Sequence, residues 1–123
     1  MDTALWVAQI VLALAFGAAG VIKLSQPKEK LAANMGWVED FSAGFVKFVG
    51  GVELLGALGL ILPGVLNIAP ILTPLAAAGL AGDQVAAAFV HLRRKEPQLI
   101  IGNLILFAVA AFIAWNRFGS YPL

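Results

Sequence analysis

The sequence predicts an all-α integral membrane protein, a four-helix bundle, from its composition and from the positions of its charges. Of its 123 residues, 61% are hydrophobic and 12% are charged, whereas a soluble domain has about 45–50% apolar and about 25% charged residues. A soluble core of this size cannot bury so much apolar surface. The charges gather in residues 23–47, in residues 93–96 and at the two ends. The stretches between them are nearly uncharged, as expected for segments that lie in a bilayer.

Four apolar windows are long enough to cross a membrane, since a spanning helix needs roughly 20 residues. We expect these helices at about residues 4–24, 43–62, 73–92 and 98–117. An interfacial segment at about 27–41 joins the first two. Because these segments fill almost the whole chain, we expect residues 1–123 to form a single transmembrane domain.

The first helix is expected to remain as a membrane span. Residues 1–3 lack the basic residues of a signal peptide, and the apolar run after them is longer than a signal-peptide core. Pro27 ends the helix, because proline disfavours helical backbone in the residue before it. The interfacial segment then mixes charges with Trp37 and Phe41. This pattern is typical of a piece at the membrane surface, with Trp37 at headgroup level.

The middle helices have proline at their predicted boundaries. The second should stop at Pro63, which has no backbone N–H and is followed by glycine. The third should begin at Thr73, a suitable N-cap. Pro74 then fits the first helical position, where a missing N–H does no harm. The fourth begins after the charged turn that ends at Pro97.

Lysine and arginine are distributed unevenly between the two sides of the predicted bundle. The first link carries Lys28 and Lys30, and the link between the third and fourth helices carries residues 93–95, which are all basic. The opposite side has only Arg117. The positive-inside rule therefore places both basic links in the cytoplasm and both termini on the non-cytoplasmic side.

Rows of small residues at a spacing of four occur on two of the predicted helices. The first helix has Ala13 and Gly17, and the third has Ala78, Gly82 and Ala86. Small side chains allow helix backbones to approach closely in lipid, where packing replaces the hydrophobic effect. We interpret both rows as surfaces of close helix packing.

Two carboxyl groups interrupt the apolar windows, Glu53 in the second helix and Asp83 in the third. Each lies about ten residues from a helix end, or about 15 Å at 1.5 Å per residue, so both are near mid-membrane. A charge at that depth costs at least about 2.5–3.5 kcal/mol on insertion scales and usually faces the bundle interior. If the two carboxyls face each other, they can share a proton.

Further polar residues lie between these carboxyls and the basic end of the bundle, whereas the outer half is almost wholly apolar. The predicted buried polar cluster, our set of candidate functional residues, comprises Glu53, Asp83, Lys23, His91, Gln84 and Asn103.

The roles of the ionisable residues stay open at the level of sequence. Glu53 is either structural, protonated or paired with Lys23, or functional, as a proton acceptor or a polar contact to a ligand. Lys47 is the poorer partner, because six residues place it on the other side of the helix. Asp83 has the same two interpretations. His91 is either an interfacial helix-end residue or a proton shuttle to the cytoplasm.

The residue inventory excludes several chemistries and assigns no catalytic residue. The chain has no cysteine, so it contains neither a thiol redox relay nor a thiolate metal site, and we expect no metal. One histidine and two methionines do not provide an ordinary two-ligand haem. No phosphate-binding glycine loop or Ser-His-Asp arrangement is apparent, and we expect no nucleic-acid partner and no catalysis by this chain alone.

Five blocks of the sequence occur in a recognisable order and spacing: residues 20–24, 27–35, 53–63, 72–80 and 91–96. Together they span nearly the whole chain and resemble the DoxX-like family. The resemblance implies a small four-helix protein of the bacterial cytoplasmic (inner) membrane. The wider family takes its name from a subunit linked to thiosulfate:quinone oxidoreduction.

The resemblance extends to part of the polar cluster. Lys23, Glu53 and His91 fall on positions of the family pattern. Asp83 does not, because residues 82–84 are polar or glycine where the family pattern is an apolar run. A family-level function therefore does not by itself account for Asp83.

Three functional hypotheses follow from these observations. The first is an accessory or quinone-facing membrane subunit of a redox system, with quinone as the ligand and a membrane or redox protein as the partner. The second is a small proton-coupled carrier that uses the midplane carboxyls. The third is a non-catalytic scaffold in the lipid bilayer, and a chain of this size often forms homo-oligomers. We favour the first.

Overall fold

The computed structural model describes residues 1–33 and 35–123. Four long helices, each apolar enough to cross a membrane, are α1 (Asp2–Ser25), α3 (Ala43–Leu66), α4 (Leu72–Arg93) and α5 (Pro97–Phe118). Between α1 and α3 lie the short helix α2 (Lys28–Ala32) and the 3-10 helix η1 (Gly36–Asp40). The prediction of an all-α protein with four membrane-spanning helices is confirmed.

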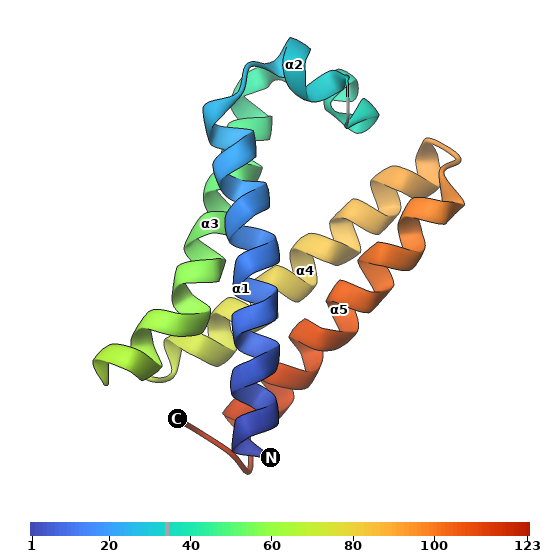
Figure 1. Ribbon diagram of the computed structural model, residues 1–123. Coiled ribbons are helices and arrows are strands. Elements are labelled where there is room, and N and C mark those ends of the chain that lie inside the picture. Colours follow the sequence, from blue (N-terminus) through green and yellow to red (C-terminus); the bar gives the residue numbers. More distant parts are fainter. Residues whose placement is uncertain (34) are drawn as a thin grey trace.

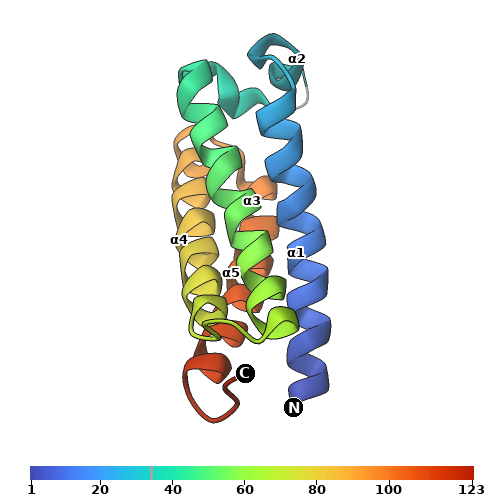
Figure 2. The same cartoon turned by 90° about the vertical axis from the view of Figure 1, so that its left-hand side faces the viewer.

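The four long helices form two pairs, α1 with α3 and α4 with α5. Figure 1 shows the pairs meeting at the end that holds both termini and diverging toward the end that holds α2 and the α4–α5 turn. The view in Figure 2 confirms that α2 and both termini lie at opposite ends of the bundle. Both basic links therefore share one end, as the positive-inside argument requires, and the side of the membrane that each end faces stays a prediction.

Glycine allows the α1–α3 pair to pack backbone against backbone. A Cβ atom on Gly20 would lie 2.7 Å from the carbonyl oxygen of Gly50, and one on Gly50 would lie 2.7 Å from Cβ of Lys23. Both distances are shorter than van der Waals contact, so only glycine fits at these positions. This close approach brings the last turns of α1 next to the part of α3 around Gly50.

The two rows of small residues differ in their surroundings. Gly17 faces α3, where a Cβ would make an ordinary contact of 3.7 Å with Ala57. The row of Ala78, Gly82 and Ala86 on α4 is exposed, and a Cβ on Gly82 would meet nothing within 4 Å. The packing prediction is therefore wrong for the α4 row within the described residues of this chain.

The helix α3 does not end at Pro63 as predicted but continues to Leu66. Asn67 then stops it in a left-handed conformation with φ of 55°. Proline inside a helix removes the N–H that would bond the carbonyl four residues earlier, here that of Gly59. A helix in lipid can continue past proline only where another group satisfies that carbonyl.

Thr73 supplies the missing donor, which corrects the prediction of an N-cap at this residue. The helix α4 begins at Leu72, so Thr73 and Pro74 lie within its first turn. The Thr73 hydroxyl donates a hydrogen bond of 2.8 Å to the Gly59 carbonyl. The Thr73 hydroxyl thus links α4 to α3 at the carbonyl that Pro63 leaves without a donor, and it does not cap α4.

The apolar core has two parts. The larger one lies among the four long helices, and its largest members are Leu12, Phe16, Leu60, Leu80 and Ile113. The smaller one consists of Leu31, Val38 and Val46, with aromatic residues packed around them. It anchors α2 and η1 on the start of α3, over the diverging end of the bundle.

A polar cavity between the helix pairs

The diverging halves of the two helix pairs enclose a cavity of about 450 Å³. Residues from α1, η1, α3, α4 and α5 line it. All six residues of the predicted polar cluster are among them: Lys23, Glu53, Asp83, Gln84, His91 and Asn103. The structure thus brings the six together around one space, while their functional role stays a prediction.

Lys23 and Glu53 form an ion pair in the lining of this cavity. The ammonium of Lys23 donates a hydrogen bond to the Glu53 carboxylate, and both residues are buried. Lys47 instead donates to the carbonyl oxygen of Leu24 at 2.9 Å. The expectation that Lys23 is the better partner is therefore confirmed. An ammonium carries three N–H donors, so two remain beyond the one given to Glu53.

A directed chain of hydrogen bonds runs from α5 to α4 beside this ion pair. Asn103 donates through Nδ2 to Oε1 of Gln84 at 2.8 Å, and Gln84 donates through Nε2 to Oδ2 of Asp83 at 3.1 Å. The Asp83 carboxyl lies within interaction range of the Glu53 carboxyl. The two carboxyls, from α3 and α4, therefore face the same part of the cavity, where Lys23 pairs with Glu53.

This series of hydrogen bonds leaves the side-chain oxygen of Asn103 without a hydrogen bond. Because a carboxylate only accepts, Asp83 orients the amide of Gln84, and Gln84 in turn orients that of Asn103. Oδ1 of Asn103 is consequently the free end, and it has no hydrogen-bond partner among residues 1–33 and 35–123. Buried polar atoms are rarely left unpaired, so such an atom needs an explanation.

Three aromatic side chains, which we call the aromatic wall, also line the cavity. Phe41 and Phe45 stack with ring centroids 4.9 Å apart, and Trp37 meets Phe41 edge-on at 5.9 Å. The Lys23 ammonium lies 5.7 Å from the Trp37 ring centroid, a cation–π distance. Trp37 was predicted at headgroup level, and this wall was not predicted from the sequence. The spacing of four between Phe41 and Phe45 was the available signal.

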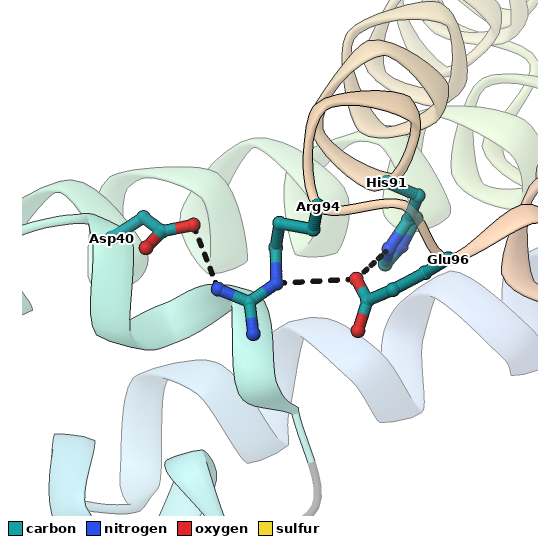
Figure 3. Close-up of polar contacts among 4 residues, drawn as sticks. All are labelled: Asp40, His91, Arg94 and Glu96. Atoms are coloured by element: carbon teal, nitrogen blue, oxygen red, sulfur yellow. Dashed lines mark hydrogen bonds and ion pairs between the residues drawn. The ribbon is translucent and has the colours of Figure 1, made fainter.

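At the open end, four polar side chains connect the interfacial segment to the α4–α5 turn (Figure 3). Arg94 donates through Nη1 to Asp40 at 2.8 Å and through Nε to Glu96 at 3.2 Å. Nδ1 of His91 lies 3.1 Å from the same Glu96 oxygen. Gly36 leaves room for the guanidinium, since a Cβ there would lie 2.9 Å from Nη2 of Arg94. These contacts join the two helix pairs at the end where they diverge most.

The same contacts change the acid–base properties of this turn. The hydrogen bond from His91, together with the nearby charge of Arg94, lowers the pKa of Glu96 below its usual 4.5. The hydrogen bond to Asp40 raises the pKa of Arg94. Both groups therefore carry their charges at neutral pH. His91 both lines the cavity and bonds at the turn, which is compatible with either of its predicted roles.

A second polar cluster, at the opposite end, shows that the prediction of an apolar outer half was wrong. Arg117 on α5 is buried and donates to Gln9 at 2.8 Å, to Asp2 at 2.7 Å and to the carbonyl oxygen of Tyr121 at 2.9 Å. Gln9 is also buried and donates to the carbonyl oxygen of Leu60 at 2.7 Å. The signal in the sequence was Gln9, the one polar residue among residues 4–22.

The comparison with known proteins identifies one family. The sequence model of the DoxX-like family matches residues 7–113. No curated protein and no solved structure matches the chain significantly. The matched range includes every residue that lines the cavity.

Proposed function

The chain belongs to the DoxX-like family, and on that premise we propose that it is a membrane subunit that holds a quinone in its cavity for a redox system. The observation that carries the proposal is the combination of three aromatic side chains with hydrogen-bonding groups around one space of about 450 Å³. Ligand sites commonly have volumes of about 300–1,000 Å³. A quinone presents the matching features, a planar ring with polar oxygens at its edge.

The aromatic wall supports the proposal through its geometry. Offset-stacked and edge-on aromatic contacts stabilise a ring by about 0.5–1.5 kcal/mol beyond its burial. Phe41, Phe45 and Trp37 all line the cavity. They offer such contacts to a flat ring between them and the polar groups.

The polar groups suit both redox forms of such a ligand. A quinone oxygen accepts hydrogen bonds, and Lys23 has ammonium donors beyond the one that it gives to Glu53. A quinol hydroxyl donates, and both Asp83 and Oδ1 of Asn103 are acceptors. Reduction of the ring consumes two protons, and Glu53, Asp83 and His91 are the titratable groups that line the way to the basic end. In this proposal the two electrons come from a partner protein.

A proton-coupled carrier is the second candidate, favoured by one specific observation. Glu53 and Asp83 face the same part of the cavity, and the ammonium of Lys23 pairs with Glu53. Two carboxyls with one ammonium leave one carboxyl free to bind and release a proton. Intramembrane carboxyls of this kind often mark proton pathways.

Binding of a tail-less quinone to the protein in lipid nanodiscs tests the proposal. The chain has three tryptophans, so Trp6→Phe and Trp115→Phe leave Trp37 as the only fluorescent indole, and it lines the cavity. We expect saturable quenching of Trp37. Phe45→Ala should weaken binding roughly two- to tenfold, the loss of one aromatic contact.

The matched control is Phe48→Ala on the same helix, because Phe48 is exposed and lies outside the cavity. Equal effects of Phe45→Ala and Phe48→Ala, or quenching that does not saturate, would contradict quinone binding. Proton flux in liposomes that Glu53→Gln abolishes would instead establish the carrier. Absence of both quinone binding and proton flux would favour the third hypothesis, a non-catalytic scaffold.

A further inference from the structure

The turn that joins α3 to α4, residues 67–71, lies outside the cavity and plays no part in the proposed function. It belongs to a stretch, residues 54–82, that contains no charged residue. Large apolar side chains at the end of α3 and on the turn are nevertheless exposed: Val65 by 65%, Leu66 by 57%, Ile68 by 63% and Ile71 by 54%. A group of exposed apolar side chains marks a surface that contacts a membrane or another protein.

The backbone at the start of α4 needs no water for its hydrogen bonds. The first four N–H groups of a helix have no acceptor within that helix. Here the N–H groups of Leu72, Thr73 and Leu75 donate to carbonyl oxygens of residues 69–71 at 3.0, 3.2 and 3.3 Å. The remaining position is Pro74, which has no N–H. This end of α4 therefore meets the requirement for backbone in lipid, where polar groups must be satisfied within the protein.

The end of α3 is satisfied in the same way. The N–H groups of Asn67 and Ile68 both donate to the carbonyl oxygen of Pro63. Within the described part of the chain, only two N–H groups of the turn make no hydrogen bond, those of Ala69 and Ile71. The ester carbonyls of phospholipids accept hydrogen bonds at the edge of the hydrocarbon layer. These two groups therefore suit that depth and not the centre of the bilayer.

The turn is also set back from the polar end of the bundle. The exposed carboxylate of Asp2 marks that end through its bond to Arg117. At Gly64, a Cβ atom would lie 2.6 Å from the ring of Trp6, which is four residues or about 6 Å inside Asp2 along α1. The helix α3 ends at Leu66, about 3 Å beyond Gly64. Figure 1 and Figure 2 both show the turn closer to the middle of the bundle than the start of α1 and the chain after α5.

From the charge-free sequence, the internally bonded backbone and the recessed position, we infer that the α3–α4 turn is immersed in the membrane. Its apolar side chains lie among phospholipid acyl chains at the edge of the hydrocarbon layer. Water is the poorer surrounding, because it would hydrate several large apolar side chains. A partner protein at this end would meet the start of α1 and the chain after α5 before it reached the turn.

Single cysteines can measure this depth, because the chain contains none. Ile68→Cys places a nitroxide spin label on the turn. Val11→Cys places one on the exposed surface of α1 within the membrane, and Ser120→Cys places one after α5. In lipid nanodiscs, collisions of each label with oxygen, which concentrates in lipid, are compared with its collisions with a water-soluble nickel chelate.

We expect the label on the turn to behave like the one at Val11, with oxygen collisions dominant, and the label at Ser120 to show the reverse. Nickel collisions at the turn as frequent as those at Ser120 would overturn the inference, because the turn would then lie in water. Shielding of the turn from both reagents would also overturn it, because protein and not lipid would then cover the turn.

Thiol reactivity gives an independent measure of the same depth. Only the thiolate reacts, and it forms poorly in apolar surroundings, so Ile68→Cys should react with a water-soluble maleimide at least about tenfold more slowly than Ser120→Cys. The two rates should become equal after denaturation in sodium dodecyl sulfate. Equal rates in nanodiscs would contradict immersion of the turn.

A carbene-generating probe that dissolves in the bilayer needs no variant. We expect it to modify residues 65–72 of the unaltered protein in nanodiscs and to leave residues 119–122 unmodified. Modification of the exposed part of α1 around Val11 is the positive control. Absence of modification in residues 65–72, with α1 modified, would overturn the inference and leave the proposed function of the cavity unaffected.

Discussion

The ammonium of Lys23 on α1 bonds to the carboxylate of Glu53 on α3 although the two residues are 30 positions apart in sequence. Both are buried where α1 and α3 pack through Gly20 and Gly50. The close contact of the two backbones therefore positions the ion pair at the cavity. Because both side chains are buried among apolar residues, each charge is stabilised mainly by the other.

Loss of Lys23 should destabilise the protein more than loss of Lys47. Removal of one partner from a buried ion pair costs about 3–5 kcal/mol, because the remaining charge is left without compensation. We expect Lys23→Met to lower the Tm in mild detergent and Glu53→Gln, added to it, to restore part of the loss. Lys47→Met is the control, since Lys47 is exposed and bonds to the carbonyl oxygen of Leu24 near the end of α1. Equal Tm values for Lys23→Met and Lys47→Met would refute this account.

Neighbouring glycines on α3 test the backbone contact. A methyl group on Gly50 would lie 2.7 Å from Cβ of Lys23, whereas one on Gly51 would meet nothing within 4 Å. We expect Gly50→Ala to destabilise by about 1–3 kcal/mol through overpacking. Gly51→Ala should be neutral or stabilising by up to about 1 kcal/mol, because alanine favours helix. Thermal unfolding of both variants, followed by circular dichroism, decides the matter.

Arg117 should hold the two ends of the chain together. It bonds to Asp2, Gln9 and the Tyr121 carbonyl, and a hydrogen bond to a charged group contributes about 1.5–3 kcal/mol. Arg117→Met should therefore lower stability by at least that amount and increase hydrogen exchange at the start of α1. Arg93→Met is the control, because Arg93 is exposed. Unchanged exchange near Asp2 in the Arg117→Met protein would contradict the role.

The α4–α5 turn should make stability depend on pH on the acid side. The pKa of Glu96 is lowered from 4.5 in the folded protein by its bond with His91 and by Arg94. The carboxylate therefore stabilises the fold fully above pH 4.5, and this contribution is lost as pH falls through the lower, folded-state pKa. Glu96→Gln should remove that part of the acid-side decrease in Tm. An identical decrease in both proteins would show that Glu96 does not contribute.

The orientation of the bundle can be measured with single cysteines, because the chain contains none. Lys30 on α2 and Ser120 after α5 are exposed, and α2 and the C-terminus lie at opposite ends of the bundle (Figure 1). We expect a membrane-impermeant thiol reagent, added to intact cells, to label Ser120→Cys and not Lys30→Cys. Permeabilised cells provide the control, in which both should react. The reverse pattern would place the termini in the cytoplasm.

Hydropathy and charge determined the class of this protein, its four membrane-spanning helices and the sharing of one end by the basic links. These properties depend on local composition, because the bilayer requires long apolar helices whatever their partners. Depth along each helix also follows from residue number, which is why the residues of the polar cluster could be chosen from the sequence.

Apart from the pairing of Lys23 with Glu53, only the tertiary structure decided which side chains meet. The continuation of α3 through Pro63 depends on the hydroxyl of Thr73, and the burial of Arg117 depends on Gln9. In each case the partner lies on another helix, and sequence periodicity does not report the rotation of one helix against the next. The cavity has the same origin, since the divergence of the two helix pairs is a property of their packing that no single helix contains.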